Sequence, residues 1–317
     1  HVSCIAPSSP TLAIVSVDSP TLRVLTNDGD LDWHLVGEPM TVFESSNDDD
    51  DGGASFLPQS MALSPSGNEV AIGGILEDDH KKLGVLKVME LRAGQWTPKG
   101  TNHESAPDAT AVYTSLSADG NYVAIGTTYQ RTGKVLHKVI LAHYSRGQWR
   151  RLLDKHGMGP HVALSSPPEY NVAMVVGSPD GKLSIHEDVH NNRDPHVINI
   201  PDLAPIDGRD IPLVSISTNG HVVAAAWGKD VGVWHKNHDS KMDDYGDREA
   251  PPEWIFSGKW RMKDPVASIS LSHDGNKVAL GLDSEHHVVV FKNVTPSDEE
   301  TDQEADKVLE DKPDSDR

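Results

Sequence analysis

The sequence predicts an all-β protein folded as a single β-propeller with six four-stranded blades. The main observation is a repeated phrase, in which an apolar run, a polar turn and a second apolar run ending in glycine follow one another. Its copies are residues 62–73, 115–126 and 270–281, with looser copies at residues 215–224 and 163–174. The turn glycines supply the positive φ angle that a tight turn between two strands needs. No segment within residues 1–294 shows the spacing of apolar residues that is typical of a long amphipathic helix.

The spacing of the repeats supports the propeller. The turn glycines Gly67 and Gly120 lie 53 residues apart, and the phrase Gly-Gln-Trp recurs at the same interval, at residues 94–96 and 147–149. Propeller blades repeat about every 40–50 residues. Two separate features that keep one interval indicate a real repeat.

Four short strands are expected in each of the first five units. They are residues 2–6, 11–15, 22–25 and 31–35; 60–64, 69–72, 83–90 and 95–98; 113–117, 122–125, 135–144 and 148–152; 161–165, 171–176, 182–186 and 196–200; 213–217, 222–227, 231–235 and 254–257. The sixth unit offers only residues 266–272, 278–282 and 287–292. Its fourth strand comes from residues 308–309, from residues outside this sequence, or not at all if the ring closes differently. A seven-bladed ring is the second choice.

Charge divides the chain into a propeller, residues 1–294, and an acidic tail, residues 295–317. The tail holds ten acidic and three basic residues and is expected to be disordered or a short helix. A second acidic stretch, at about residues 44–54, is expected to be a flexible loop. The net charge of −20 argues against binding to nucleic acid or anionic lipid. The tail is a candidate for docking on a basic partner surface.

Several features of the sequence bear on the compartment. No run approaches the roughly 20 apolar residues of a membrane span, and the single cysteine, Cys4, excludes a disulfide within the chain. The first residue is His1, which is compatible with a removed targeting segment. Asn293 begins the sequence Asn-Val-Thr, a glycosylation signal. We therefore expect a secreted, cell-surface or organelle-lumen protein, with the cytoplasm as the alternative.

The repeat phrase resembles a known family. Residues 115–126, a Gly-Lys-Val strand at residues 133–135 and the Gly-Gln-Trp at residues 147–149 resemble FG-GAP-type repeats, in particular those of propeller-like proteins from diatoms and marine bacteria. Residues 231–234 (Val-Gly-Val-Trp) resemble the third strand of WD repeats, a lower-ranked alternative. Both resemblances imply a propeller, and neither implies a reaction.

A histidine-rich stretch is the first candidate metal site. His186-Glu187-Asp188-Val189-His190 has the H-E-x-x-H form of zinc proteases, and His196 follows six residues later. That chemistry needs the first two histidines one helical turn apart on a helix. Here a strand is expected to end at His186, so a connection between two strands is the preferred interpretation.

A second candidate metal site would hold calcium. Asp28, Asp30 and Asp32 alternate around Gly29 and could offer oxygen ligands, and FG-GAP repeats of integrins bind calcium through similar loops. The order Asp-x-Asp-x-Asp-Gly is absent, and a hairpin turn explains the stretch equally well. No cofactor is predicted, and zinc or calcium remain the options.

The sequence predicts a non-catalytic protein-interaction scaffold or accessory subunit. It contains neither a G-x-S-x-G nucleophile motif nor a phosphate-binding loop. Trp33, Trp96, Trp149 and Trp254 recur near the outer strands and are expected to pack between blades. The alternatives are a metal-dependent hydrolase or lyase with its site at the axial mouth, and a cell-surface carbohydrate-binding propeller that uses these aromatic side chains.

Overall fold

The structure, a computed structural model, describes residues 2–5, 11–16, 21–27, 29, 32–43, 54–78, 81–165, 172–187, 196–199, 211–237, 253–283 and 288–292. For residues 2–5 and 196–199 it describes the backbone alone. The predicted acidic tail and nearly all of the predicted acidic loop lie outside these ranges, as does Asn293.

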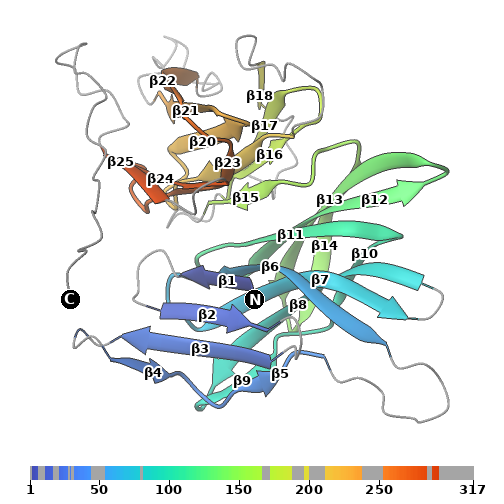
Figure 1. The fold of residues 1–317 in the computed structure, drawn as a ribbon. Coiled ribbons are helices and arrows are strands. Elements are labelled where there is room, and N and C mark those ends of the chain that lie inside the picture. Colours follow the sequence, from blue (N-terminus) through green and yellow to red (C-terminus); the bar gives the residue numbers. More distant parts are fainter. Residues whose placement is uncertain are drawn as a thin grey trace, which may run out of the picture.

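Six antiparallel sheets follow one another along the chain as the blades of a β-propeller (Figure 1). The first contains β1 (Val2–Ile5), β2 (Thr11–Val15), β3 (Thr21–Asn27), β4 (Trp33–Leu35) and β5 (Met40–Thr41). The second contains β6 (Ser55–Leu63), β7 (Glu69–Asp78), β8 (Lys81–Arg92), β9 (Gln95–Pro98) and β10 (His103–Pro107). The third contains β11 (Ala109–Leu116), β12 (Tyr122–Arg131), β13 (Lys134–Ser145) and β14 (Gln148–His156).

The second half of the chain repeats the pattern. The fourth sheet contains β15 (Val162–Leu164), β16 (Met174–Gly177), β17 (Lys182–His186) and β18 (His196–Asn199). The fifth contains β19 (Leu213–Ile216), β20 (Val222–Trp227), β21 (Asp230–Lys236) and β22 (Trp254–Arg261). The sixth contains β23 (Val266–Leu271), β24 (Lys277–Leu282) and β25 (Val288–Lys292). The predicted all-β class and the six blades are confirmed, and the described ranges contain no helix.

Two strands were not expected from the sequence. β5 pairs with β3 in the first sheet, and β10 pairs with β8 in the second, where β8 also pairs with β9. β8 can hold both partners because its 12 residues are longer than either of them. The second sheet therefore has five strands.

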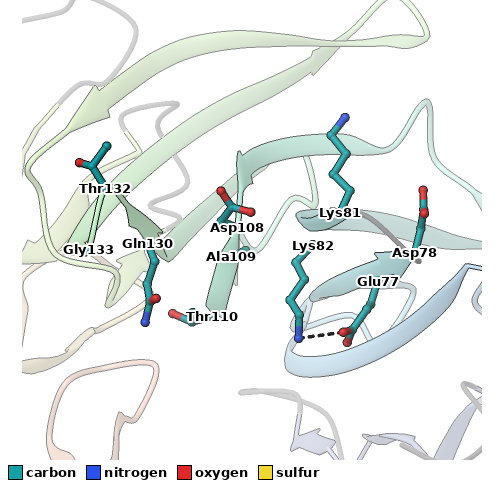
Figure 2. A pocket seen from close by; sticks show the side chains of 10 residues that line it. All are labelled: Glu77, Asp78, Lys81, Lys82, Asp108, Ala109, Thr110, Gln130, Thr132 and Gly133. Atoms are coloured by element: carbon teal, nitrogen blue, oxygen red, sulfur yellow. Dashed lines mark ion pairs between the residues drawn. The ribbon is translucent and has the colours of Figure 1, made fainter.

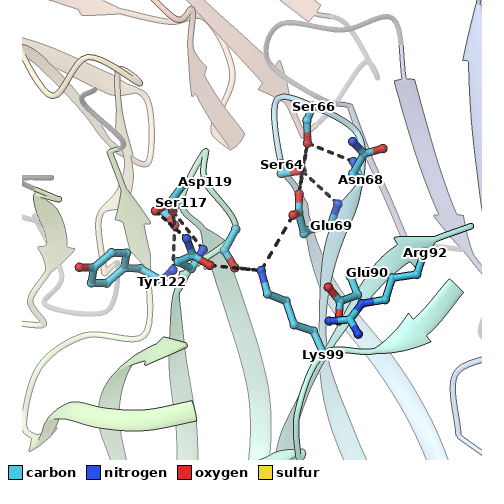
Figure 3. A network of polar contacts seen from close by, with 12 residues as sticks. Ser64, Ser66, Asn68, Glu69, Glu90, Arg92, Lys99, Ser117, Asp119 and Tyr122 are labelled. Atoms are coloured by element: carbon cyan, nitrogen blue, oxygen red, sulfur yellow. Dashed lines mark hydrogen bonds and ion pairs between the residues drawn. The ribbon is translucent and has the colours of Figure 1, made fainter. Parts of the chain in front are cut away.

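The repeated phrase forms the connection between the first and second strands of a blade. In the third blade, the amide of Gly120 donates to the carbonyl oxygen of Ser117 at 2.9 Å, and Gly120 has a φ of 64°. The hydroxyl of Ser117 accepts from the amide of Tyr122 at 2.8 Å and donates to the carboxylate of Asp119 (Figure 3). One side chain thus closes the turn and starts the next strand.

The same serine recurs in other blades. The hydroxyls of Ser64, Ser165, Ser217 and Ser272 each accept from the first or adjacent amide of the following strand segment, at 2.8–3.1 Å. In the sixth blade, hydrogen bonds lower the pKa of Asp274 to about 2, and the largest effect comes from the hydrogen bond that the Ser272 hydroxyl donates. The sequence repeat is thus a repeat of hydrogen bonds.

The core consists of separate apolar clusters between successive blades. Five clusters join the first blade to the second, the second to the third, the third to the fourth, the fourth to the fifth, and the fifth to the sixth. Among the described residues, no such cluster joins the sixth blade to the first. This arrangement buries both faces of the middle blades, and the second strands of the fourth and fifth blades, β16 and β20, are buried along their whole length.

Tryptophans connect neighbouring blades as predicted, with one exception. The indole nitrogens of Trp96, Trp149 and Trp254 donate to Val36, Lys99 and Glu187 of the preceding blade. Trp33, on the outer strand of the first blade, is instead 47% exposed. The blade that precedes the first in the order of the propeller is the sixth, and no apolar cluster of described residues connects these two blades.

The described residues contain no helix that is long and apolar enough to cross a membrane.

Candidate functional site

The second and third blades carry the longest hairpins of the described chain. β7 and β8 have 10 and 12 residues and stay paired to Asp78 and Lys81. β12 and β13 have the same lengths and stay paired to Arg131 and Lys134. The corresponding strands of the fifth blade, β20 and β21, have 6 and 7 residues. Both long hairpins project on the same side of the propeller (Figure 1).

A hollow of about 630 Å³ lies between the tips of these hairpins (Figure 2). Its lining comes from the β7–β8 tip, from the junction of β10 and β11, and from the β12–β13 tip: Glu77, Asp78, Lys81, Lys82, Asp108, Ala109, Thr110, Gln130, Thr132 and Gly133. We call it the hairpin hollow. Most of these side chains are exposed, so the hollow is open to solvent.

Asp108 joins the two hairpins at the base of the hollow. Its amide donates to the carbonyl oxygen of Lys82 at 2.7 Å, and its carbonyl oxygen accepts from the amide of Gln130 at 3.1 Å. Its φ of 53° is a left-handed conformation that aspartate tolerates better than most residues do. These two backbone bonds fix the spacing of the hairpins and leave the carboxylate of Asp108 on the exposed side.

Charges of both signs surround the hollow. Lys82 Nζ lies 2.8 Å from Glu77 Oε1, and the two side chains are 53% and 44% exposed. An exposed ion pair of this kind contributes only about 0–1 kcal/mol, so either group can exchange its partner for a charge on a bound molecule. Asp78, Lys81 and Asp108 add three more exposed charges.

The histidines with strongly shifted pKa values lie away from the hollow. Burial lowers the pKa of His103, His161 and His186 to about 4, with smaller contributions from Arg151, His137 and Lys155, respectively. His161 packs edge-on against Tyr113 at 4.3 Å, and His103 packs edge-on against Trp149 at 5.6 Å. The described lining of the hollow contains no histidine, cysteine or serine. Its chemistry is therefore suited to binding charged and polar groups.

A second polar cluster lies between the same two blades, among the serine turns (Figure 3). Lys99 is 5% exposed, and its ammonium donates to the carbonyl oxygen of Gly120 at 2.8 Å. It also lies 3.9 Å from Glu69 and 5.1 Å from the ring centre of Tyr144. Glu69 in turn accepts from the hydroxyl of Ser64 at 2.7 Å. A buried cation with this many partners holds two blades together and is closed to a ligand.

The candidate zinc stretch is only partly described. His186 is the last residue of strand β17, so the helix that the zinc-protease pattern requires does not begin there. Glu187 accepts from the indole of Trp254 at 3.1 Å and lies 3.4 Å from Lys236 Nζ, which commits it to packing between the fourth and fifth blades. His190 lies outside the described residues, and His196 is described by its backbone alone.

The candidate calcium stretch is also only partly described, because Asp28 and Asp30 lie outside the described residues. Gly29 has a φ of 103°, and its amide donates to Asn27 Oδ1 at 2.7 Å, as in a tight turn. Asp32 is exposed beside β4. Within the described ranges no three His, Cys, Asp or Glu residues come close enough together to hold a metal ion.

The hairpin hollow was not predicted from the sequence. Its lining comes from three segments up to 56 residues apart, Glu77 to Gly133, and only the fold brings them together. One signal was available: the strand pattern of residues 69–78 and 122–131 continues past the repeat phrase into charged and polar residues. Such extensions are absent from the described second strands of the fourth and fifth blades.

Comparison with known proteins identifies the fold alone. The chain matches no protein-family model and no curated protein. It is similar to a functionally unknown protein from Desulfotomaculum acetoxidans (12% identity, TM-score 0.60, 92% of this chain and 82% of that chain). It is also similar to a Bacteroides uniformis protein described as a "putative 6-phosphogluconolactonase" (13% identity, TM-score 0.59, 92% and 80%).

A third similar structure is named as a propeller. It is the β-propeller domain of Cps50 (Swd1) from Myceliophteria thermophila, with 11% identity, a TM-score of 0.54, and coverage of 92% of this chain and 82% of that chain. This similarity supports the predicted propeller. The finer assignment to FG-GAP-type repeats stays a prediction, since no family model matches.

Proposed function

We propose that this chain is a non-catalytic propeller that binds a partner protein at the hairpin hollow. The observation that carries the proposal is the pair of extended hairpins, β7–β8 and β12–β13, whose spacing Asp108 fixes through two backbone hydrogen bonds. Recognition surfaces are commonly loops and hairpin tips held by a rigid scaffold. The blade cores beneath these hairpins are buried and supply that scaffold.

The charges in the hollow indicate the kind of partner. Lys81 and Lys82 lie opposite Asp78 and Glu77 in the pairing of β7 with β8, and Asp108 adds a negative charge from the junction of β10 and β11 (Figure 2). A polypeptide segment that carries both signs of charge can pair with the lysines and with the acidic residues of this lining. The volume of about 630 Å³ accommodates several side chains, since binding pockets commonly span about 300–1,000 Å³.

The experiment is a quantitative pull-down from the source organism with charge variants of the hollow. Asp108→Asn keeps a residue that tolerates the left-handed backbone but removes the charge, and Lys81→Glu reverses a charge at a hairpin tip. Recovery of a specific partner is expected to fall about tenfold for each. Arg150→Glu, an equally exposed change on β14, is the matched control and should recover the partner fully.

Two measurements separate this proposal from its alternatives. Turnover on a panel of lactone, ester and glycoside substrates would contradict a non-catalytic role. Stoichiometric zinc or calcium in the purified protein would favour the metal-dependent alternative, to be tested first at His186, His190 and His196, and then at Asp28, Asp30 and Asp32.

The proposed compartment is secretory or luminal, and it rests on the sequence around Asn293. Mass spectrometry of the protein purified from its source would detect a glycan on Asn293. Exclusive recovery of the unmodified asparagine from a cytoplasmic fraction would contradict this placement.

A further inference from the structure

In the part of the chain that the structure describes, one edge of the third strand of the sixth blade has no paired strand. Within the described residues β25 pairs only with β24, whereas the third strand of every other blade pairs on both sides. Those doubly paired strands are β3, β8, β13, β17 and β21. We call the unpaired side of residues 288–292 the sixth-blade edge.

The side chains along this edge are apolar and exposed. Val288 is 71% exposed and Val290 is 52% exposed, and the two lie on one face because side chains alternate along a strand. The equivalent Val231 and Val233 of the fifth blade are fully buried because the sixth blade packs against them, whereas no described blade packs against Val288 and Val290. Exposed edge strands are usually protected by charged side chains. Lys292 is the one charged residue of β25.

The edge is held in place by the fifth blade. Phe291 stacks on Trp260 with ring centres 5.4 Å apart and planes inclined by 26°. Val278 and Leu280 of the neighbouring β24 are fully buried in the cluster shared with the fifth blade. A strand fixed in this way loses little conformational freedom when another strand pairs with it.

The first blade is uncovered on the facing side of the ring. Trp33 and Leu35 of its outer strand are 47% and 51% exposed. The three corresponding tryptophans, Trp96, Trp149 and Trp254, each donate to the blade before their own. The blade before the first is the sixth, whose described part ends at β25. Apolar side chains are therefore exposed on both the sixth and the first blade.

We propose that a partner protein supplies an extended strand that pairs with β25 and completes the sixth blade. This surface is distinct from the hairpin hollow, and the proposal does not depend on that site. The backbone of the sixth-blade edge provides the hydrogen bonds, and Val288 and Val290 select apolar side chains on the incoming strand. The position filled is that of β9, β14 and β22 in complete blades.

The register of the sheet defines one charged position on the partner. Lys277 and Lys292 lie directly opposite each other in the pairing of β24 with β25, and both are exposed. Like charges in that arrangement repel each other. An acidic residue on the incoming strand opposite Lys292 relieves the repulsion. The preferred partner strand is therefore acidic at this position and apolar two and four residues later.

Composition disfavours the two other sources of a strand. Residues 293–317 contain ten acidic and three basic residues, and few β-branched or aromatic ones, so they are a poor match for the two valines. A second copy of the chain would bring a net charge of −20 and a second Lys292 to the same edge. A strand from another protein has neither disadvantage.

The test uses the full chain and a fluorescent peptide, acetyl-Gly-Ser-Glu-Thr-Val-Thr-Val-Gly-Ser-amide. Antiparallel pairing places its glutamate opposite Lys292 and its valines opposite Val290 and Val288. We expect saturable binding by fluorescence anisotropy with a Kd below about 1 mM. We also expect slower amide exchange in residues 288–292 and unchanged exchange in β14, a charged outer strand.

Variants distinguish strand pairing at the sixth-blade edge from non-specific hydrophobic binding of the peptide. Val288→Lys and Val290→Lys should each weaken binding at least about fivefold without lowering the melting temperature, since both side chains are exposed. Val135→Lys, at a valine that is 59% exposed on β13, is the matched control and should bind normally. Lys292→Glu should reverse the preference, so that a peptide with lysine in place of glutamate binds better.

Three results would overturn the proposal. The first is the absence of binding at millimolar peptide concentration, and the second is an equal loss of peptide binding with Val135→Lys. The third is slow amide exchange of residues 288–292 in the free chain that becomes fast when the chain is shortened to end at Asn293. The last result would show that residues of the same chain provide the strand. Concentration-dependent dimerisation abolished by Val290→Lys would assign the edge to a second copy and would equally contradict a partner strand.

Discussion

The indole nitrogen of Trp96 donates a hydrogen bond to the carbonyl oxygen of Val36 at 2.7 Å, across the boundary between the first and second blades. Trp96 is 6% exposed and belongs to the apolar cluster that joins these blades. Trp149 repeats the contact one blade later with the carbonyl oxygen of Lys99. One residue type thus combines apolar packing with a directed bond between blades.

Replacing Trp96 by phenylalanine should lower the free energy of unfolding by about 1–3 kcal/mol, because the carbonyl oxygen of Val36 loses its donor and the smaller ring leaves space. Urea denaturation followed by circular dichroism measures this change. Trp33→Phe is the control, and it should change stability by no more than about 0.5 kcal/mol because Trp33 is half exposed. Equal effects of both changes would refute the assigned role of Trp96.

The turn serines should differ in importance according to burial. Ser117 is fully buried, so Ser117→Ala strands the amide of Tyr122 and should cost about 1–3 kcal/mol. Ser272 makes the same bond to Lys277 but is only half buried, so water can replace it and Ser272→Ala should cost less than about 1 kcal/mol. Chemical denaturation of the two variants provides the comparison, and a larger cost at Ser272 would contradict the model of the turn.

Gly126 allows two blades to approach closely. A Cβ atom at this position would lie 1.7 Å from the carbonyl oxygen of Pro160 in the next blade. Gly126→Ala should therefore destabilise the protein by at least about 3 kcal/mol or prevent its folding. Gly258→Ala, where the nearest atom would be 3.9 Å away, should change stability by less than about 1 kcal/mol. Thermal unfolding of the Gly126 variant near the wild-type temperature would argue against this packing.

Mild acid should destabilise the fold through three buried histidines. His103, His161 and His186 have pKa values lowered to about 4 from 6.5. Between these values the unfolded chain binds more protons than the folded one, so stability decreases as the pH falls from about 6.5 to about 4. Each of the three histidines should lower the free energy of unfolding by about 2 kcal/mol when the pH falls from 7 to 5.

Urea unfolding at pH 7 and pH 5 measures this loss. The single variants His103→Gln and His186→Gln should each reduce the difference between the two pH values. Stability that is constant or higher at pH 5 would contradict neutral, buried histidines.

The repeat made the fold predictable from sequence because each copy contains its own turn. Asp119-Gly120 and the strands beside it interact over fewer than ten residues, so local chemistry determines their structure. Within the described residues the sixth blade has three strands, in agreement with a strand pattern that ends at Lys292, and the source of a fourth strand stays a prediction. Contacts between blades were predicted only through the recurrence of tryptophan, and Trp33, which is 47% exposed, is the exception.

The hairpin hollow shows what local patterns could not provide. Lys81, Asp108 and Gln130 belong to different hairpins or connections, and their proximity depends on how two blades pack. The left-handed backbone of Asp108 has no signature in the sequence that separates it from other aspartates. The zinc candidate showed the opposite weakness, because a spacing that matches a motif says nothing about the element that carries it. His186 ends a strand.

The proposed role of the hairpin hollow is tested most directly by site-specific photo-crosslinking in the source organism. A photoreactive side chain at Thr110, in the lining of the hollow, is compared with one at Arg150, on the outer edge of the third blade. The account predicts a discrete crosslinked protein partner from Thr110 that Asp108→Asn removes and Arg150 does not give. Crosslinks of the same partner from Arg150, or none from Thr110 while the partner still co-purifies, would contradict it.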